Sequence, residues 1–161
     1  MIRSLKLAFV ALVVASILGG AGADGTSFAV IVHKDVPLSS LSTTDLRKVY
    51  LGDRQFWNPG MRIIPFIRTA VTRERAAVVW TICKMTEADF NRHWIGKMMR
   101  AEATASPKQF STNPAAINLV MNMPGAIAIV NAGQVPAGEV KVLKIDGKLP
   151  GDAEYALRFQ D

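Results

Sequence analysis

Three short apolar runs, separated by segments of helical periodicity, constrain the fold of this chain more than any other feature. They read FAVIVH, RIIPFIR and AIAIV, and span residues 28–33, 62–68 and 126–130. Each has the length and the β-branched content of a buried strand. Between the runs, apolar residues recur at intervals of three and four, as in amphipathic helices. Strands that alternate with helices predict an α/β fold, a mixed and mostly parallel sheet of four or five strands flanked by about four helices.

Capping residues mark where these helices begin and end. Ser42 and Thr86 are each followed three residues later by Asp, a variant of the capping box. Thr72 precedes another helix, and Asn113 with Pro114 begins a fourth, because proline suits the first helical position. Gly52 ends the first helix.

The chain pattern also predicts which side chains are buried. Ala76, Val79, Trp80 and Cys83 repeat at helical spacing, which places this face in the core. Pro65, inside the second apolar run, indicates an edge position or a bulge. Further expectations concern the remaining segments: an exposed loop at 53–60 with Phe56 and Trp57, a loop at 101–111, a strand at 139–145 and a short last strand at 155–159.

The first 23 residues have the three parts of a secretory signal peptide. Arg3 and Lys6 are followed by an apolar run at 7–18 and by small residues up to Ala23. A run of twelve residues is too short for a membrane-spanning helix, which needs about 20. We therefore expect cleavage after Ala23, a mature domain at residues 24–161 with no stable membrane anchor, and a periplasmic or secreted location.

The charge of the chain favours anionic partners. Its net charge is +6, and loss of Arg3 and Lys6 with the signal peptide leaves +4. Such an excess attracts anions over a long range. The basic residues are scattered rather than clustered, and the chain carries an export signal, so we expect no nucleic-acid partner.

No constellation typical of catalysis is visible in the sequence. His33 and His93 lie 60 residues apart on different elements, and neither has a neighbour at metal-ligand spacing. Cys83 is the only cysteine, so it forms no internal disulfide, and it lies on an apolar helix face. Glycine-rich phosphate loops are absent. We predict a protein that is not an enzyme, with no catalytic residue, metal site or cofactor.

The segment 68–74 carries the one chemical suggestion. It joins a strand to a helix, and a helix start offers unpaired N–H groups and a partial positive charge to an anion. Thr69 and Thr72 add hydroxyl groups, and Arg68 and Arg73 add guanidinium donors. The alternative is structural: Thr72 is an ordinary helix cap, the arginines are solvated, and Glu74 itself occupies the positive helix end.

Several stretches of the chain resemble the periplasmic phosphate-binding proteins of ABC transporters, which have the type II periplasmic binding-protein fold. Residues 28–57 follow the family's strand, leucine-led helix and Y/F-x-G ending; the strand RIIPFIR enters a helix; PGAIAIV at 124–130 resembles PGAIGYV; and a last short segment lies at 149–158. The resemblance covers nearly all of residues 24–161. It implies a short relative that corresponds to one of the family's two lobes.

The resemblance also implies a site. The family's phosphate loop is similar to R-S-x-G-S-G-T, and this chain keeps the arginine at Arg68 and hydroxyl residues at Thr69 and Thr72. It departs from the loop at four positions: Ala70 replaces a frequent acidic residue, Val71 and Arg73 replace glycines, and Glu74 replaces a hydroxyl residue.

The expected function is therefore non-catalytic solute binding. Phosphate or a similar small oxyanion would bind to Arg68, Thr69, Thr72 and Arg73, and the protein partner would be an ABC transporter or another envelope protein. The second expectation is a ligand-free accessory module of the envelope that uses the same fold for protein interaction.

Overall fold

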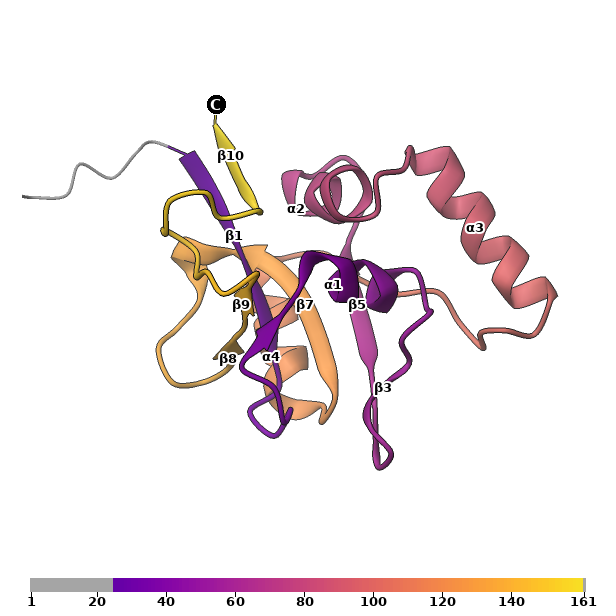
Figure 1. The fold of residues 1–161 in the computed structure, drawn as a ribbon, viewed down its shortest axis with the longest axis horizontal. Coiled ribbons are helices and arrows are strands. Elements are labelled where there is room, and N and C mark those ends of the chain that lie inside the picture. Colours follow the sequence, from indigo (N-terminus) through magenta and orange to yellow (C-terminus); the bar gives the residue numbers. More distant parts are fainter. Residues whose placement is uncertain (1–24, 161) are drawn as a thin grey trace, which may run out of the picture.

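The computed structural model describes residues 25–160, and a mixed six-stranded sheet forms its centre (Figure 1). The strand order is β10-β1-β7-β5-β6, and β8 also pairs with β1. The strands are β1 (Gly25–Val32), β2 (Ser40–Leu41), β3 (Phe56–Asn58), β4 (Met61–Arg62), β5 (Ile64–Arg68), β6 (Lys108–Phe110), β7 (Ala126–Asn131), β8 (Lys141–Val142), β9 (Lys144–Ile145) and β10 (Arg158–Gln160). The signal peptide predicted at residues 1–23 lies outside the described residues.

The expected mixed α/β architecture is confirmed, although parallel pairings are not in the majority. Strand β1 pairs antiparallel with β10, β7 and β8, whereas β5 pairs parallel with β6 and β7. Two small two-stranded sheets, β2–β9 and β3–β4, lie beside the main sheet. The parallel part therefore comprises β7, β5 and β6, and their carboxyl ends share one edge.

Helices cover both faces of the sheet, as predicted. They are α1 (Thr43–Tyr50), α2 (Arg73–Ala76), the π-helix η1 (Ala77–Ile82), α3 (Glu87–Met99), α4 (Asn113–Asn122) and the 3-10 turn η2 (Ala132–Gln134). Strand β1 shows the alternation that this requires. Phe28, Val30 and Val32 pack in the core formed with α1, η1 and α3, while Ala29 and Ile31 pack towards α4.

The predicted caps are present at the starts of the helices. The hydroxyl of Ser42 accepts from the backbone N–H of Asp45 at 3.0 Å, and that of Thr86 accepts from Asp89 at 3.1 Å. Thr72 caps α2, and the residue before the predicted start at Asn113, Thr112, caps α4. Because these side chains satisfy otherwise unpaired N–H groups, local sequence alone determines where the four helices begin.

The prediction that Trp80 is buried is wrong. Its side chain is 62% exposed, whereas Val78 and Ile82 are buried. Residues 77–82 form a π-helix, in which the Cys83 N–H reaches the carbonyl of Val78 at 2.9 Å. The wider turn shifts the buried stripe relative to ordinary α-helical spacing, and this rotates the indole outwards.

The loop predicted at 53–60 contains a strand and a buried tryptophan. Phe56 is 49% exposed as expected, but Trp57 is only 6% exposed and donates its indole N–H to the carbonyl of Gly125 at 2.9 Å. Residues 56–58 and 61–62 form the β3–β4 hairpin. The exposure predicted for Trp57 is therefore wrong. The turn that contains Gly125, far away in the sequence, provides the hydrogen-bond acceptor that allows the indole to be buried.

Three other segments refine the expected strands. The region 101–111 contains β6, and the strand expected at 139–145 is divided into β8 and β9. Pro65 lies in the interior strand β5, but only β7 pairs with it, since the β6 pairing begins at Phe66. Its missing N–H is tolerated at this locally one-sided position.

Within residues 25–160, no helix has the length and apolar character needed to cross a membrane.

Candidate functional site

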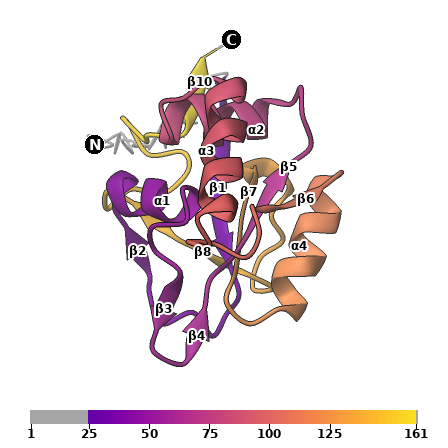
Figure 2. The same ribbon diagram turned by 90° about the vertical axis from the view of Figure 1, so that its right-hand side faces the viewer.

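The predicted anion-binding residues lie where the parallel strands end and two helices begin. Arg68 is the last residue of β5, Thr72 caps α2, and Phe110 ends the neighbouring strand β6 shortly before α4. Figure 2 shows β5, β6, β7 and α4 side by side, with α2 close to β5. Ligands of open α/β sheets bind preferentially outside the carboxyl ends of the strands.

A buried asparagine that the sequence analysis treated only as a helix start connects this edge. Asn113, 6% exposed, accepts from Arg68 Nη1 at 3.4 Å through its Oδ1. Its Nδ2 donates to Glu74 Oε1 at 2.9 Å and to Gln134 Oε1 at 2.8 Å. Asn113 therefore ties β5, α2 and η2 together. Its position beside Pro114 suggested a cap, and no local signal distinguished this second role.

The Glu74 carboxylate is turned towards α4. Within residues 25–160, the carboxylate accepts a hydrogen bond from the Asn113 amide. None of the backbone N–H groups of residues 70–75 donates to it. Glu74 lies in the first turn of α2, where its charge complements the helix dipole as the structural alternative states, but its carboxylate does not cap the N–H groups of that helix.

Thr69 and Thr72 differ in whether their hydroxyl groups already have hydrogen-bond partners within the protein. The Thr72 hydroxyl accepts from the Arg75 N–H at 3.3 Å and donates to the Thr69 carbonyl at 3.0 Å. It is a helix cap, as the structural alternative states. The Thr69 N–H donates to the Phe110 carbonyl at 3.0 Å, and its hydroxyl has no hydrogen-bond partner within residues 25–160.

The loop between β5 and α2 keeps a conformation that glycine favours. Val71 has a φ of 64° and is fully exposed, although a β-branched residue rarely adopts positive φ. Val71 occupies one of the two positions at which the phosphate loop of the family that the sequence resembles has glycine. The backbone N–H groups of Ala70, Val71 and Glu74 have no acceptor among the described residues.

Arg68 and Arg73 diverge from the common start that the sequence suggested. The Arg68 guanidinium lies over the Phe110 ring at 5.7 Å, and its Nε is buried with no partner in the described part of the chain. Arg73 is exposed and, among its contacts, donates to Thr26 Oγ1 of β1 at 3.4 Å. The structure thus brings Arg68, Thr69 and Thr72 together, while Arg73 extends towards β1.

Arg75 supports the edge from beneath. It is 5% exposed, and its Nη1 donates to the Arg68 carbonyl at 3.1 Å. Its Nε and Nη2 form two bonds with the Glu87 carboxylate, at 2.8 and 2.9 Å. Because Glu87 neutralises Arg75, Arg75 adds no net charge to the edge. Sequence periodicity did not single out Arg75, since arginine is rarely buried.

The residues considered for catalysis have structural surroundings. Burial raises the pKa of the Cys83 thiol to about 12, so it is not a thiolate at neutral pH. His33 Nδ1 accepts from the Asp35 N–H at 3.2 Å, and His93 Nε2 lies 2.9 Å from the Leu51 carbonyl. The described residues contain no group of three or more His, Cys, Asp or Glu side chains arranged to hold a metal ion.

Comparison with solved structures shows the fold. The chain matches a phosphate ABC transporter substrate-binding protein with bound phosphate from Clostridium perfringens, at TM-score 0.66 and 19% identity, over 84% of this chain and 53% of that one. It matches an ABC-type phosphate transport receptor from Vibrio cholerae at TM-score 0.66 and 18% identity, over 84% and 54%. It also matches PstS from Borrelia burgdorferi at TM-score 0.65 and 12% identity, over 84% and 55%.

These matches extend over about half the length of the other proteins, and at such identities they show a common fold. No protein-family model matches the chain, and no curated protein matches it.

Proposed function

We propose that this chain is a non-catalytic, exported solute-binding protein that binds phosphate or a similar small oxyanion at the carboxyl edge of β5 and β6. The observation that supports this most directly is the Asn113 hydrogen bond to Glu74. It holds the Glu74 carboxylate towards α4, so the N–H groups at the start of α2 stay available to an anion.

Each proposed ligand residue has a defined part in binding. Arg68 supplies a guanidinium group. Within residues 25–160, its hydrogen bond to Asn113 is long, at 3.4 Å. Thr69 supplies its hydroxyl, Thr72 keeps the loop and helix start in place, and Arg73 adds positive charge beside the edge. The amides of Ala70, Val71 and Glu74 supply further donors.

The affinity for such an anion should be modest and sensitive to salt. Ala70 and Val71 are exposed, so water reaches one side of the site and screens its charges. The two-lobed arrangement implied by the resemblance would cover that side with a second lobe. The phosphate-binding proteins of the same fold support phosphate as the first anion to test. An ABC transporter or another envelope protein is the proposed partner, in the periplasm or outside the cell.

Calorimetry with phosphate and with sulfate tests this proposal. We expect heat of binding and a rise in the unfolding midpoint at millimolar anion. Arg68→Gln should weaken phosphate binding about tenfold or more, because a charge-assisted hydrogen bond is lost. Glu74→Gln should strengthen it by removing a negative charge.

Arg92→Gln is the matched control, because Arg92 is an exposed arginine of α3 whose described partner is Asp89. It should leave phosphate binding unchanged. Neither heat nor a thermal shift at millimolar phosphate or sulfate would remove the oxyanion proposal.

A second candidate function is protein interaction without a ligand. Large apolar side chains are exposed on η1 and α3: Trp80 at 62%, Ile95 at 55% and Met99 at 83%. Figure 1 shows α3 at the margin of the molecule. A stable partner in envelope extracts, retained by the wild type and lost by Met99→Glu, with no effect of anions, would favour this candidate over oxyanion binding.

A further inference from the structure

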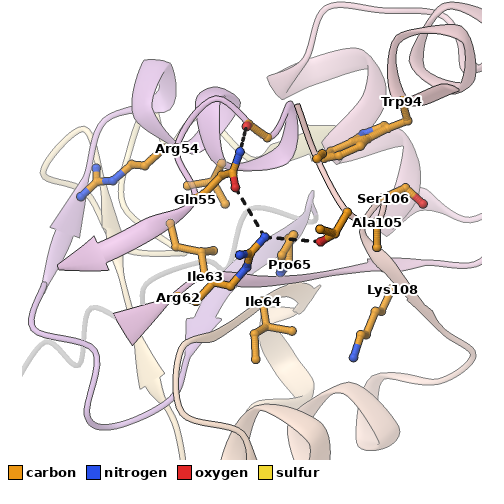
Figure 3. Close-up of a pocket in the computed structure, with 14 residues that line it drawn as sticks. Arg54, Gln55, Arg62, Ile63, Ile64, Pro65, Trp94, Ala105, Ser106 and Lys108 are labelled. Atoms are coloured by element: carbon orange, nitrogen blue, oxygen red, sulfur yellow. Dashed lines mark hydrogen bonds between the residues drawn. The ribbon is translucent and has the colours of Figure 1, made fainter. Parts of the chain in front are cut away.

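A cavity lies at the opposite end of β5 from the proposed oxyanion edge. A pocket of about 270 Å³ opens between the beginning of β5, the β3–β4 hairpin, α3 and the segment 103–108 (Figure 3). Its volume is close to the lower end of the roughly 300–1,000 Å³ that small-molecule pockets occupy. Because β5 has five residues, about 13 Å of strand separates its two ends. The two sites share no proposed ligand residue.

The inner wall of the pocket is apolar. Ile64 and Pro65 of β5 line it together with Trp94 of α3 and Ala103 and Ala105 of the following segment. Figure 3 shows the Trp94 ring reaching from α3 towards the side of the pocket where Gln55 lies. Trp94 is 4% exposed, and its indole Nε1 is buried with no hydrogen-bond partner among the described residues. Such a wall favours a ligand with a flat or aliphatic body.

The rim of the pocket is basic. Arg62 and Lys108 both line it, both are exposed, and neither forms an ion pair with an acidic side chain in the described chain. Arg54 lines it as well, although its guanidinium lies 3.9 Å from Asp45. No aspartate or glutamate belongs to the lining.

The two acidic residues that adjoin the lining along the chain, Asp53 and Glu102, each form an ion pair with a basic side chain. Asp53 accepts from Lys97 at 2.6 Å, and Glu102 accepts from Arg100 at 2.6 Å. Arg100 also holds the pKa of the Glu102 carboxyl below its usual range. The positive charge of Arg62 and Lys108 is therefore not cancelled within the pocket.

Arg62 is the central cation of this arrangement. In Figure 3 its guanidinium lies between Gln55 on one side and the 104–106 segment on the other. Its hydrogen bonds to Gln55 Oε1 and Thr104 Oγ1 are long, at 3.4 and 3.5 Å. Because both acceptors are neutral and distant, exchanging them for a carboxylate would replace weak bonds with stronger charge-assisted ones.

We propose that this pocket binds a small amphipathic carboxylate, with its anionic group on Arg62 and Lys108 and its apolar body against Trp94, Ile64 and Pro65. The combination of an apolar wall and a cationic rim selects for both parts of the ligand. A bare oxyanion leaves the wall uncovered, and a neutral hydrocarbon leaves the guanidinium with its weak neutral acceptors.

The test uses 3-phenylpropionate as the probe, with the wild-type protein, isothermal calorimetry and NMR of the indole N–H signals. We expect saturable binding that shifts the Trp94 indole signal, assigned through Trp94→Phe. The neutral amide, 3-phenylpropionamide, should bind at least tenfold more weakly, because it lacks the charge that Arg62 and Lys108 recognise. Inorganic phosphate should not displace the probe.

Variants separate the pocket from the rest of the surface. Arg62→Gln and Lys108→Gln should each weaken probe binding, the former about tenfold, and Ala105→Trp should abolish it by filling the pocket. Lys144→Gln, at an exposed lysine of β9, is the matched control and should have no effect. Thermal unfolding of each variant establishes that it is folded before binding is compared.

Three outcomes would overturn the inference: no binding of the probe at millimolar concentration, equal binding of the acid and the amide, or binding that Ala105→Trp leaves intact. Loss of phosphate binding in Arg68→Gln with retained probe binding would show that the two sites fail or succeed independently.

Discussion

The ion pair between Arg75 and Glu87 allows a quantitative test of how the proposed oxyanion-binding edge of β5 and β6 is held in place. The Arg75 side chain is 7% exposed and that of Glu87 is 41% exposed, and the two share hydrogen bonds of 2.8 and 2.9 Å. Removing one partner of a fully buried pair costs about 3–5 kcal/mol, because the other charge is left unpaired. Because water reaches the Glu87 carboxylate and screens its charge, the cost should be smaller here. We expect Glu87→Gln to lower the free energy of unfolding by about 2 kcal/mol.

The double variant distinguishes a stranded charge from lost packing. Arg75→Met removes the buried cation together with its bond to the Arg68 carbonyl, which contributes about 1 kcal/mol. In the Arg75→Met background, Glu87→Gln should change the free energy of unfolding only slightly, because no buried cation is left unpaired. The double variant should therefore lose about 1–2 kcal/mol less stability than the two single variants lose in sum.

Urea denaturation followed by circular dichroism measures these free energies of unfolding. A loss of about 2 kcal/mol should also lower the melting temperature by roughly 6 °C for a domain of this size. Glu154→Gln is the matched control: Glu154 accepts from Lys148 at 2.9 Å but is 87% exposed, so its loss should leave the melting temperature unchanged. The reasoning fails if Glu87→Gln behaves like this control, or if the single losses are simply additive.

Three further predictions follow from local geometry. Gly125→Ala should lower the free energy of unfolding measured with urea by about 3 kcal/mol or more. Gly125 has a φ of 86°, the new Cβ would lie 2.1 Å from the Arg62 carbonyl oxygen, and the two hydrogen bonds to the Gly125 carbonyl would be strained. Unchanged stability would contradict this. Two hydrogen bonds from Thr43, first its hydroxyl and then its N–H, hold the pKa of Asp146 below its usual range, so the stabilisation exists above about pH 4 and is lost as the pH falls further. Asp146→Asn should therefore lower the melting temperature at pH 7, and the effect should shrink as the pH falls below about 4; an effect that does not change with pH would refute the linkage. Cys83, with its pKa raised to about 12 by burial, should react with a thiol reagent at pH 8 only after unfolding, so rapid labelling of the native protein would contradict its burial.

Much of the fold could be predicted from the sequence because its signals are local. The apolar run predicted at 28–33 lies largely in β1, which ends at Val32, the run at 126–130 lies in β7, and capping residues marked the starts of α1, α2 and α3. These signals depend on neighbours a few residues away, which any folded context preserves. The short strand β6 was missed because three residues, two of them exposed, carry no periodicity.

The candidate site was only partly predictable. Arg68, Thr69 and Thr72 could be proposed from the strand-to-helix junction, and the structure places them together. Whether Glu74 would block the helix start depended on Asn113, which lies 39 residues further along the chain. No local pattern indicates that an asparagine at one helix start will bind a glutamate at another.

The sequence by itself determined the alternation of strands and helices and the positions at which the helices begin. Tertiary structure alone decided which ends of the strands meet, where Trp57 and Trp80 lie, and how Arg62 and Lys108 come to border one apolar pocket. The physical reason is the range of the interactions: caps and periodicity act within a turn or a strand, whereas burial and charge pairing depend on residues that only the folded sheet brings together.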